Sequence, residues 1–101
     1  MCKKLIRYEL SEEADIDIDE IFDYTERQHG FNLAVKYLSD LDTLFKNLII
    51  NPEIGRKRNE IRTELYSISG QEHVIFYRIL NDHIRIVRVL HGSKDMPRHF
   101  K

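Results

Sequence analysis

Two apolar runs near the end of the chain flank a polar pair, which is the pattern of a β-hairpin. Residues 72–92 are EHVIFYRILNDHIRIVRVLHG, with the turn-forming pair Asn81-Asp82 between stretches rich in Val, Ile, Phe, Tyr and Leu. In the second stretch, alternation predicts one face with Ile84, Ile86, Arg88 and Leu90 and the other with Arg85, Val87 and Val89. Both faces are mostly apolar, which predicts a central strand. Each face also carries one arginine, and a half-buried cation needs a partner or a function.

The first part of the chain predicts a strand followed by a helix. Residues 4–10 alternate between apolar and polar positions. Ser11 is a suitable N-cap, and the acidic residues just after it favour the positive end of a helix dipole. The helix should bury one stripe and end at Gly30; the stripe is Ala14, Ile18, Ile21, Phe22 and Thr25. Its many acidic residues predict a solvated surface on the remaining faces.

A second helix is predicted directly after Gly30. Its apolar residues recur mostly at steps of three and four: Phe31, Ala34, Val35, Leu38, Leu41, Phe45, Leu48 and Ile49. Asn51-Pro52 should end it, because the residue before a proline avoids the helical region. So short a connection predicts an antiparallel helical hairpin.

The remaining segments complete a predicted β–αα–βββ order. Residues 52–61 are expected to be largely loop, and residues 62–69 a second strand that turns at Gly70-Gln71 into the hairpin. Strands grouped after helices predict an α+β fold, with the helical hairpin packed on a mainly antiparallel four-stranded sheet. The whole chain, residues 1–101, is expected to form a single domain.

Composition places the chain among globular proteins and leaves its charge open to two interpretations. Apolar residues make up 42% and charged residues 33%, no apolar run could span a bilayer, and the N-terminus lacks a secretory h-region. Cys2 is the only cysteine, so we expect a reducing, cytoplasmic location. Residues 1–55 hold 6 Lys/Arg and 12 Asp/Glu, whereas residues 56–101 hold 10 and 5. The basic part could meet an anionic partner, with the Arg56, Lys57 and Arg58 cluster on phosphates, or the two parts could simply neutralise each other.

Metal and cofactor motifs are weak. The five histidines never stand at an H-x-x-x-H spacing, and the chain has no Gly-rich phosphate loop. Asp15, Asp17, Asp19 and Glu26 match positions of a calcium loop, but Glu20 stands where its sharp turn needs glycine. The sequence therefore predicts no metal and no cofactor.

Several short segments recur in a characteristic order and spacing over nearly the whole chain. They are Ala14, Asp17-Ile18, Ile21, Tyr24, Gly30, Ala34, Tyr37, Pro52-Glu53-Ile54-Gly55, Glu60-Ile61-Arg62, His73-Val74-Ile75-Phe76-Tyr77-Arg78, Ile86-Val87-Arg88-Val89-Leu90-His91, Asp95 and Arg98. In these segments the chain resembles the ParE-type toxins of the ParE/RelE superfamily from bacterial toxin–antitoxin pairs.

The resemblance implies the β–αα–βββ fold and an activity that depends on binding rather than on turnover. ParE-type toxins poison DNA gyrase by trapping it in a cleaved complex with DNA. A cognate ParD-like antitoxin, usually a ribbon-helix-helix protein, wraps and silences the toxin, and operator DNA is contacted only through the antitoxin. The expected protein is thus a gyrase inhibitor that is not an enzyme and does not engage a membrane.

Two alternatives stay open: a ribosome-dependent mRNA endoribonuclease of RelE type, and a non-toxic relative that only binds an antitoxin. RelE-like sequences carry basic side chains where this chain has Val74 and Ser93. His91 and His99 could still act as acid and base.

Two sets of candidate residues follow. The basic end of the chain suggests a gyrase-inhibiting surface of Arg88, His91, Lys94, Asp95 and Arg98. Apolar residues at the edge of the second helix suggest an antitoxin surface, Leu33, Tyr37, Leu44 and Ile50, with an antitoxin helix in a groove and an extended segment on a sheet edge.

Overall fold

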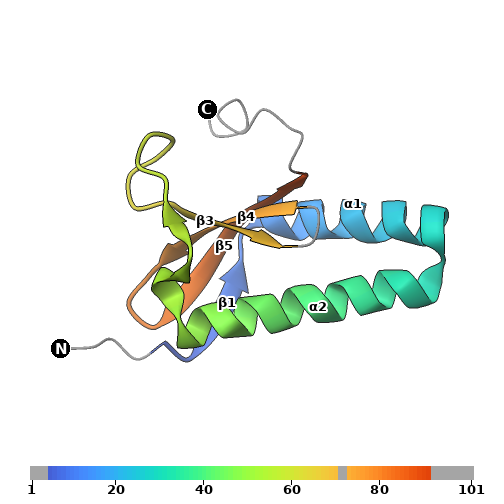
Figure 1. Ribbon diagram of the computed structural model, residues 1–101, viewed down its shortest axis with the longest axis horizontal. Helices are drawn as coiled ribbons and strands as arrows, with labels where there is room; N and C mark the ends of the chain where they lie inside the picture. The colour runs from blue at the N-terminus through green and yellow to red at the C-terminus, as the bar shows by residue number, and fades with distance from the viewer. Residues whose placement is uncertain (1–4, 71–72, 92–101) are drawn as a thin grey trace.

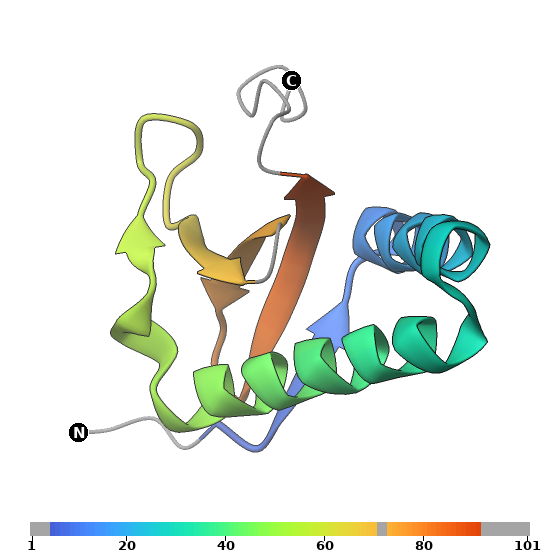
Figure 2. The ribbon, with the colours of Figure 1, turned by 45° about the vertical axis from the view of Figure 1, so that its right-hand side comes forward.

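A computed structural model describes residues 5–70 and 73–91 and shows a helical hairpin joined to a twisted sheet (Figure 1). Its elements are β1 (Arg7–Leu10), α1 (Glu12–His29), α2 (Phe31–Ile50), the 3₁₀ helix η1 (Pro52–Ile54), β2 (Arg56–Lys57), β3 (Tyr66–Gly70), β4 (His73–Ile79) and β5 (His83–His91). The two helices meet at the end of the molecule farthest from the sheet (Figure 2). No helix in the described part of the chain is long and apolar enough to cross a membrane.

The helices begin and end where the sequence predicts. The Ser11 hydroxyl accepts a hydrogen bond from the Ala14 N–H at 3.0 Å and caps α1. Gly30 adopts a φ of 95°, which a residue with a side chain rarely does, and it alone separates α1 from α2. α2 ends before Asn51-Pro52. The predicted helical hairpin is confirmed.

The sheet has five strands in the order β1-β5-β4-β3-β2. β1 runs parallel to β5, and the other pairs are antiparallel. The predicted fold class is confirmed, and β5 is central, as its two apolar faces indicate. The strand count differs from four because Arg56 and Lys57, expected in a loop, pair with Ser67 and Tyr66.

The predicted strand at residues 62–69 begins only at Tyr66. The preceding segment is folded into turns: the Leu65 carbonyl accepts from the Arg58 N–H at 2.6 Å, and the Leu65 N–H donates to Arg62 at 3.2 Å. Glu64 also has a φ of 65°, which is incompatible with an extended strand. Because local turn bonds use these backbone groups, they are unavailable to a sheet.

A β-bulge changes the faces predicted for β5. Phe76 pairs with Arg88 and Tyr77 with Ile86, so Val87 is an extra residue on β5. One extra residue shifts the alternation. Val89 therefore joins Ile84 and Ile86 in the core beneath the helices, while Leu90 joins the cluster on the opposite face. The predicted grouping of Leu90 with Ile84 and Ile86 was wrong for this reason.

Each face of the sheet has its own apolar cluster. The larger one fills the space between sheet and helices, and its buried members include Leu41, Phe45, Leu48, Ile75 and Tyr77. The smaller one contains Leu65, Phe76 and Leu90, with Ile61 packed against it. The turn segment before β3 thus contributes Ile61 and Leu65 to the cluster on the sheet face opposite the helices.

The Tyr77 hydroxyl fastens the segment between α2 and β2 to the sheet. It donates to the Pro52 carbonyl at 2.7 Å and accepts from the Gly55 N–H at 3.0 Å. A methyl group at Gly55 would collide with this hydroxyl and lie 2.8 Å from the Ser67 carbonyl oxygen. The P-x-x-G sequence at residues 52–55 therefore provides both backbone partners of the Tyr77 hydroxyl. Burial, the larger effect, raises the pKa of the phenol, although the bond from Gly55 opposes it.

We expect Tyr77→Phe to lower the free energy of unfolding by about 1–3 kcal/mol, because it leaves two backbone groups without their partner. Urea denaturation measures the change. Tyr24→Phe is the matched control, since Tyr24 is 60% exposed and should change stability by less than about 0.5 kcal/mol. Equal stability of the two variants would contradict this role of the Tyr77 hydroxyl.

Candidate functional site

The described residues form a cleft of about 700 Å³ between α1 and α2, closed at one end by β4 and β5. On α1 its lining residues fall at positions i, i+3, i+4 and i+7 and so share one helix face; they include Asp17, Glu20, Ile21 and Tyr24. Leu33, Tyr37 and Asp40 repeat the same spacing on α2. The cleft exists because the two facing stripes are not packed against each other along their full length.

The walls of the cleft expose large apolar side chains. Tyr24 is 60% exposed and Leu33 is 45% exposed. Near the helix junction Phe22 and Phe31 contact each other edge to face, with ring centroids 6.0 Å apart. This aromatic contact helps α1 and α2 hold together where they meet, while Tyr24 and Leu33 remain accessible between them.

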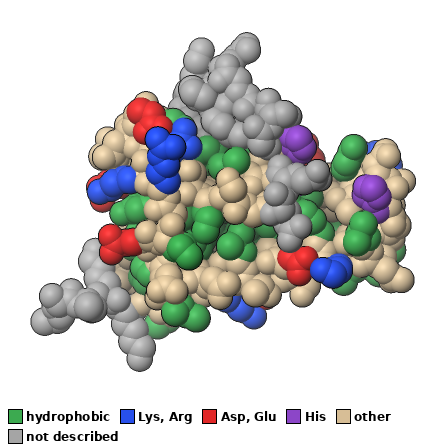
Figure 3. Space-filling view, in the orientation of Figure 1, with side chains coloured by type: hydrophobic (Ala, Val, Ile, Leu, Met, Phe, Trp, Pro, Cys, Tyr) green, Lys and Arg blue, Asp and Glu red, His purple; other side chains and the backbone are tan. Residues whose placement is uncertain are grey.

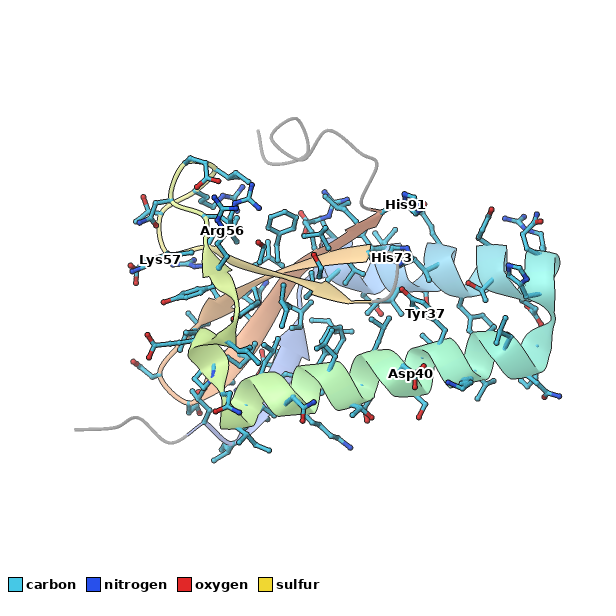
Figure 4. The ribbon with its side chains drawn as sticks, viewed as in Figure 1. Tyr37, Asp40, Arg56, Lys57, His73 and His91 are labelled. Carbon is cyan, nitrogen blue, oxygen red and sulfur yellow. The ribbon has the colours of Figure 1, made fainter. Side chains whose placement is uncertain are left out.

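Two histidines and a tyrosine meet at the sheet end of the cleft. His73 and His91 are paired across β4 and β5, and their ring centroids lie 5.5 Å apart. The Tyr37 hydroxyl hydrogen-bonds to His73 Nδ1. Figure 4 shows Tyr37 extending from α2 toward these strands, with Asp40 farther along the same helix. Imidazole and phenol groups could transfer protons in RNA cleavage. Whether an RNA phosphate can bind beside them depends on the surrounding charges.

The charges around these histidines are mainly negative. Asp17, Glu20 and Asp40 line the cleft, and Lys36 is the one lysine or arginine among its described lining residues. Lys36 pairs with Asp40 at 3.2 Å. Carboxylates thus outnumber lysines and arginines in the described lining, although Arg88 and Lys36 pair with two of them, Asp17 and Asp40.

Asp17 and Arg88 connect the cleft wall to β5. Arg88 Nε donates to Asp17 Oδ2 at 2.8 Å, and Nη2 donates to Oδ1 at 3.0 Å. The Val89 N–H donates to the same Oδ2 at 3.0 Å. The hydrogen bonding that Arg88 donates to the Asp17 carboxylate is the largest cause that raises the pKa of Arg88. This two-bond ion pair gives Arg88 the partner that its half-buried position requires.

The structure brings together only part of the proposed antitoxin surface. Leu33 and Tyr37 both line the cleft. Leu44 is partly buried against the core, close to Gly70 of β3. Ile50 is 74% exposed but lies at the far end of α2, beside the exposed Ile54. The four candidates therefore do not form one continuous surface.

The proposed gyrase surface also divides. Arg88 lies in the ion pair with Asp17, whereas His91 reaches the end of the cleft. Lys94, Asp95 and Arg98 lie outside the described residues. The basic cluster at residues 56–58 is partly neutralised, since Arg58 pairs with Glu60 at 2.6 Å and Lys57 lies 3.9 Å from Glu64. Basic and acidic side chains accordingly stand next to each other at the left of Figure 3.

Sequence reasoning missed Glu20 and Asp40 as cleft residues and treated His73 only as a matching position. The spacing of Asp17, Glu20, Ile21 and Tyr24 on one helix face was the available sign that α1 has a second functional stripe. His73 could be placed opposite His91 only once the strand register was known.

Comparisons with known proteins agree on one family. Residues 8–96 match the family model described as ParE toxin of type II toxin–antitoxin system, parDE. Toxin ParE1 of Mycobacterium tuberculosis is 38% identical over 93 residues, which cover 91% of this chain and 95% of that protein. Toxin ParE1 of Caulobacter vibrioides is 30% identical, with the same coverages. A structure titled chromosomal ParDE TA system from P. aeruginosa superposes with a TM-score of 0.72 and 20% identity, over 87% of this chain and 97% of that one.

We expect Asp17→Asn to destabilise the fold by about 2–4 kcal/mol, because it removes the charge that compensates Arg88 in a largely buried place. Asp17 is 8% exposed in the ion pair. Asp19→Asn, on an exposed position of the same helix, should cost less than about 0.5 kcal/mol. Chemical denaturation compares the two variants, and equal effects would show that the ion pair with Arg88 adds no stability.

Proposed function

Because the chain belongs to the ParE toxin family of type II toxin–antitoxin systems, we propose that it inhibits DNA gyrase by binding and trapping the enzyme in its cleaved complex with DNA. The family match over residues 8–96 is the observation that carries this proposal. Such an action requires contacts rather than turnover, so the protein acts as a binding inhibitor and not as an enzyme. Its target is in the cytoplasm.

The chemistry of the cleft supports binding over RNA cleavage. Cleavage of an RNA phosphodiester needs positive groups near the phosphate, because negative charge develops there. Val74, at the third-strand position where RelE-like sequences are basic, instead packs against the Leu65, Phe76 and Leu90 cluster. His73 and His91 lie in a cleft with Asp17, Glu20 and Asp40. Lys36, the one lysine or arginine in the described lining, is already paired with Asp40, so this cleft offers no excess of cationic side chains to hold a phosphate.

The partner of the toxin in this proposal is a ParD-like antitoxin, which contacts operator DNA on behalf of the pair. An antitoxin helix fits the interhelical cleft, where Tyr24, Leu33 and Tyr37 offer apolar contacts at helical spacing. Leu44 packs on the core and is not part of the cleft lining. Ile50 with Ile54 forms a separate apolar point at the other end of α2.

When the purified protein is added to gyrase and supercoiled plasmid, cleaved DNA should accumulate. The cognate antitoxin should suppress this accumulation. Deletion of residues 94–101 should reduce the cleaved fraction at least tenfold, because it removes Lys94, Asp95 and Arg98 from the basic part of the chain. Gel electrophoresis after detergent treatment measures cleavage.

The deletion variant is compared only if its circular dichroism and its antitoxin affinity equal those of the full chain. A folded deletion variant with full potency would move the toxic surface elsewhere, with Arg56 and Lys57 as the next candidates. A full-length protein that binds antitoxin but never increases cleaved DNA would contradict gyrase inhibition and favour the non-toxic relative.

Programmed ribosomes should keep their message intact in the presence of the protein. Without a cationic donor beside the phosphate, the transition state of RNA cleavage loses on the order of 3 kcal/mol of stabilisation per missing donor. Primer extension on the message detects cuts. Site-specific cleavage that disappears in His73→Ala and His91→Ala variants would overturn the binding-only mechanism and establish the endoribonuclease.

A further inference from the structure

The interhelical cleft has the length of a short peptide helix. Its lining residues on α1 extend from Asp17 to His29, which corresponds to about 18 Å of helix. Those on α2 begin at Leu33 and end at Asp40, so both walls continue over two turns or more. A trough of this shape accommodates an elongated segment of polypeptide better than a compact ligand.

The apolar contacts in the cleft repeat at the period of a helix. Ile21 and Tyr24 come from one wall, and Leu33 and Tyr37 come from the other. Figure 3 shows hydrophobic side chains beside a histidine at the right-hand, helical end of the molecule. An apolar stripe with residues at positions i, i+3 and i+4 complements such walls.

The charge of the helical hairpin is strongly one-sided. In α1, one basic residue stands against eight acidic ones: Arg27 against Glu12, Glu13, Asp15, Asp17, Asp19, Glu20, Asp23 and Glu26. In α2 the charges balance, with Lys36 and Lys46 against Asp40 and Asp42. The two helices together therefore carry a formal charge of −7.

Two acidic side chains place this charge on both walls of the cleft. Glu20 lies on α1, and Asp40 lies on α2. Asp17 is already engaged by Arg88, so it serves the fold. Asp40 contacts Lys36, whose side chain is 69% exposed and can be exchanged for a cation of a partner at little cost. An anionic or neutral segment would gain no favourable charge interaction with Glu20 and Asp40.

We propose that the cleft selects a cationic amphipathic segment, with one apolar stripe between the helices and Lys or Arg side chains directed at Glu20 and Asp40. This inference rests on the proposed function, since it specifies the chemistry of the antitoxin segment that occupies the cleft. It assigns Glu20 and Asp40 as specificity residues, while Tyr24 and Leu33 supply apolar contact.

The test uses the full-length protein and three labelled helical peptides of about 14 residues. The peptides share one leucine stripe and differ only in their flanking residues, which are Lys, Gln or Glu. Fluorescence anisotropy measures their dissociation constants at neutral pH and at low and high salt. The cleft variant carries Glu20→Gln and Asp40→Asn. Its control carries Asp19→Asn and Asp23→Asn, which change the net charge equally at exposed positions of α1 outside the cleft lining.

The Lys peptide should bind the native protein and the control variant with similar affinity, and the cleft variant about tenfold more weakly. High salt should reduce its advantage over the Gln peptide. Equal binding of the three peptides, absence of binding, or equal weakening in both variants would overturn the inference.

Failure of the proposed function would be seen separately. The gyrase assay and antitoxin suppression do not depend on the peptides. A protein that poisons gyrase and is silenced by antitoxin, yet shows no preference for the Lys peptide, keeps the proposed function and loses only the charge selectivity of its cleft.

Discussion

The Asp17 carboxylate attaches the start of the helical hairpin to the sheet, because it accepts hydrogen bonds from two residues of β5. β1 ends at Leu10, but β5 continues to His91, so among the described residues no strand pairs with the later part of this β5 edge. The start of α1 replaces the missing strand: the Ser11 N–H donates to the Ile86 carbonyl at 2.9 Å, and Asp17 accepts from the Val89 N–H at 3.0 Å. Buried backbone groups need such partners. Arg88 then balances the charge of the same carboxylate.

This edge contact also explains why β5 contains a bulge. Val87 has no partner in β4, and its carbonyl accepts from the Ser11 hydroxyl at 2.7 Å. The extra residue re-aims the strand after Ile86, which places Val89 in the core and allows Arg88 to reach Asp17. A strictly alternating strand would put every following side chain on the opposite face. The bulge at Val87 and the ion pair between Arg88 and Asp17 are therefore structurally coupled.

Local patterns were sufficient to predict the two helices and the final hairpin, but they predicted neither β2 nor the long-range contacts. Ser11, Gly30 and Asn51-Pro52 act within one turn of the chain, so the sequence determined both helices closely. The bulge at Val87 depends on how β4 pairs with β5, and no alternation pattern contains that information. The same limit applies to the cleft. Asp17 and Arg88 are 71 positions apart, and Tyr37 meets His73 across 36 positions.

The cleft combines a buried ion pair, which stabilises the fold, with exposed apolar side chains, which lower its stability. Asp17 and Arg88 stabilise the junction because each satisfies the other in a place with little water. Tyr24, about two turns farther along α1, and Leu33, on α2, remain exposed at an unfavourable solvation energy. Such exposure is retained where a partner covers the surface. A firmly attached base and an open outer part therefore let the hairpin present a preformed groove, which reduces the ordering cost of association.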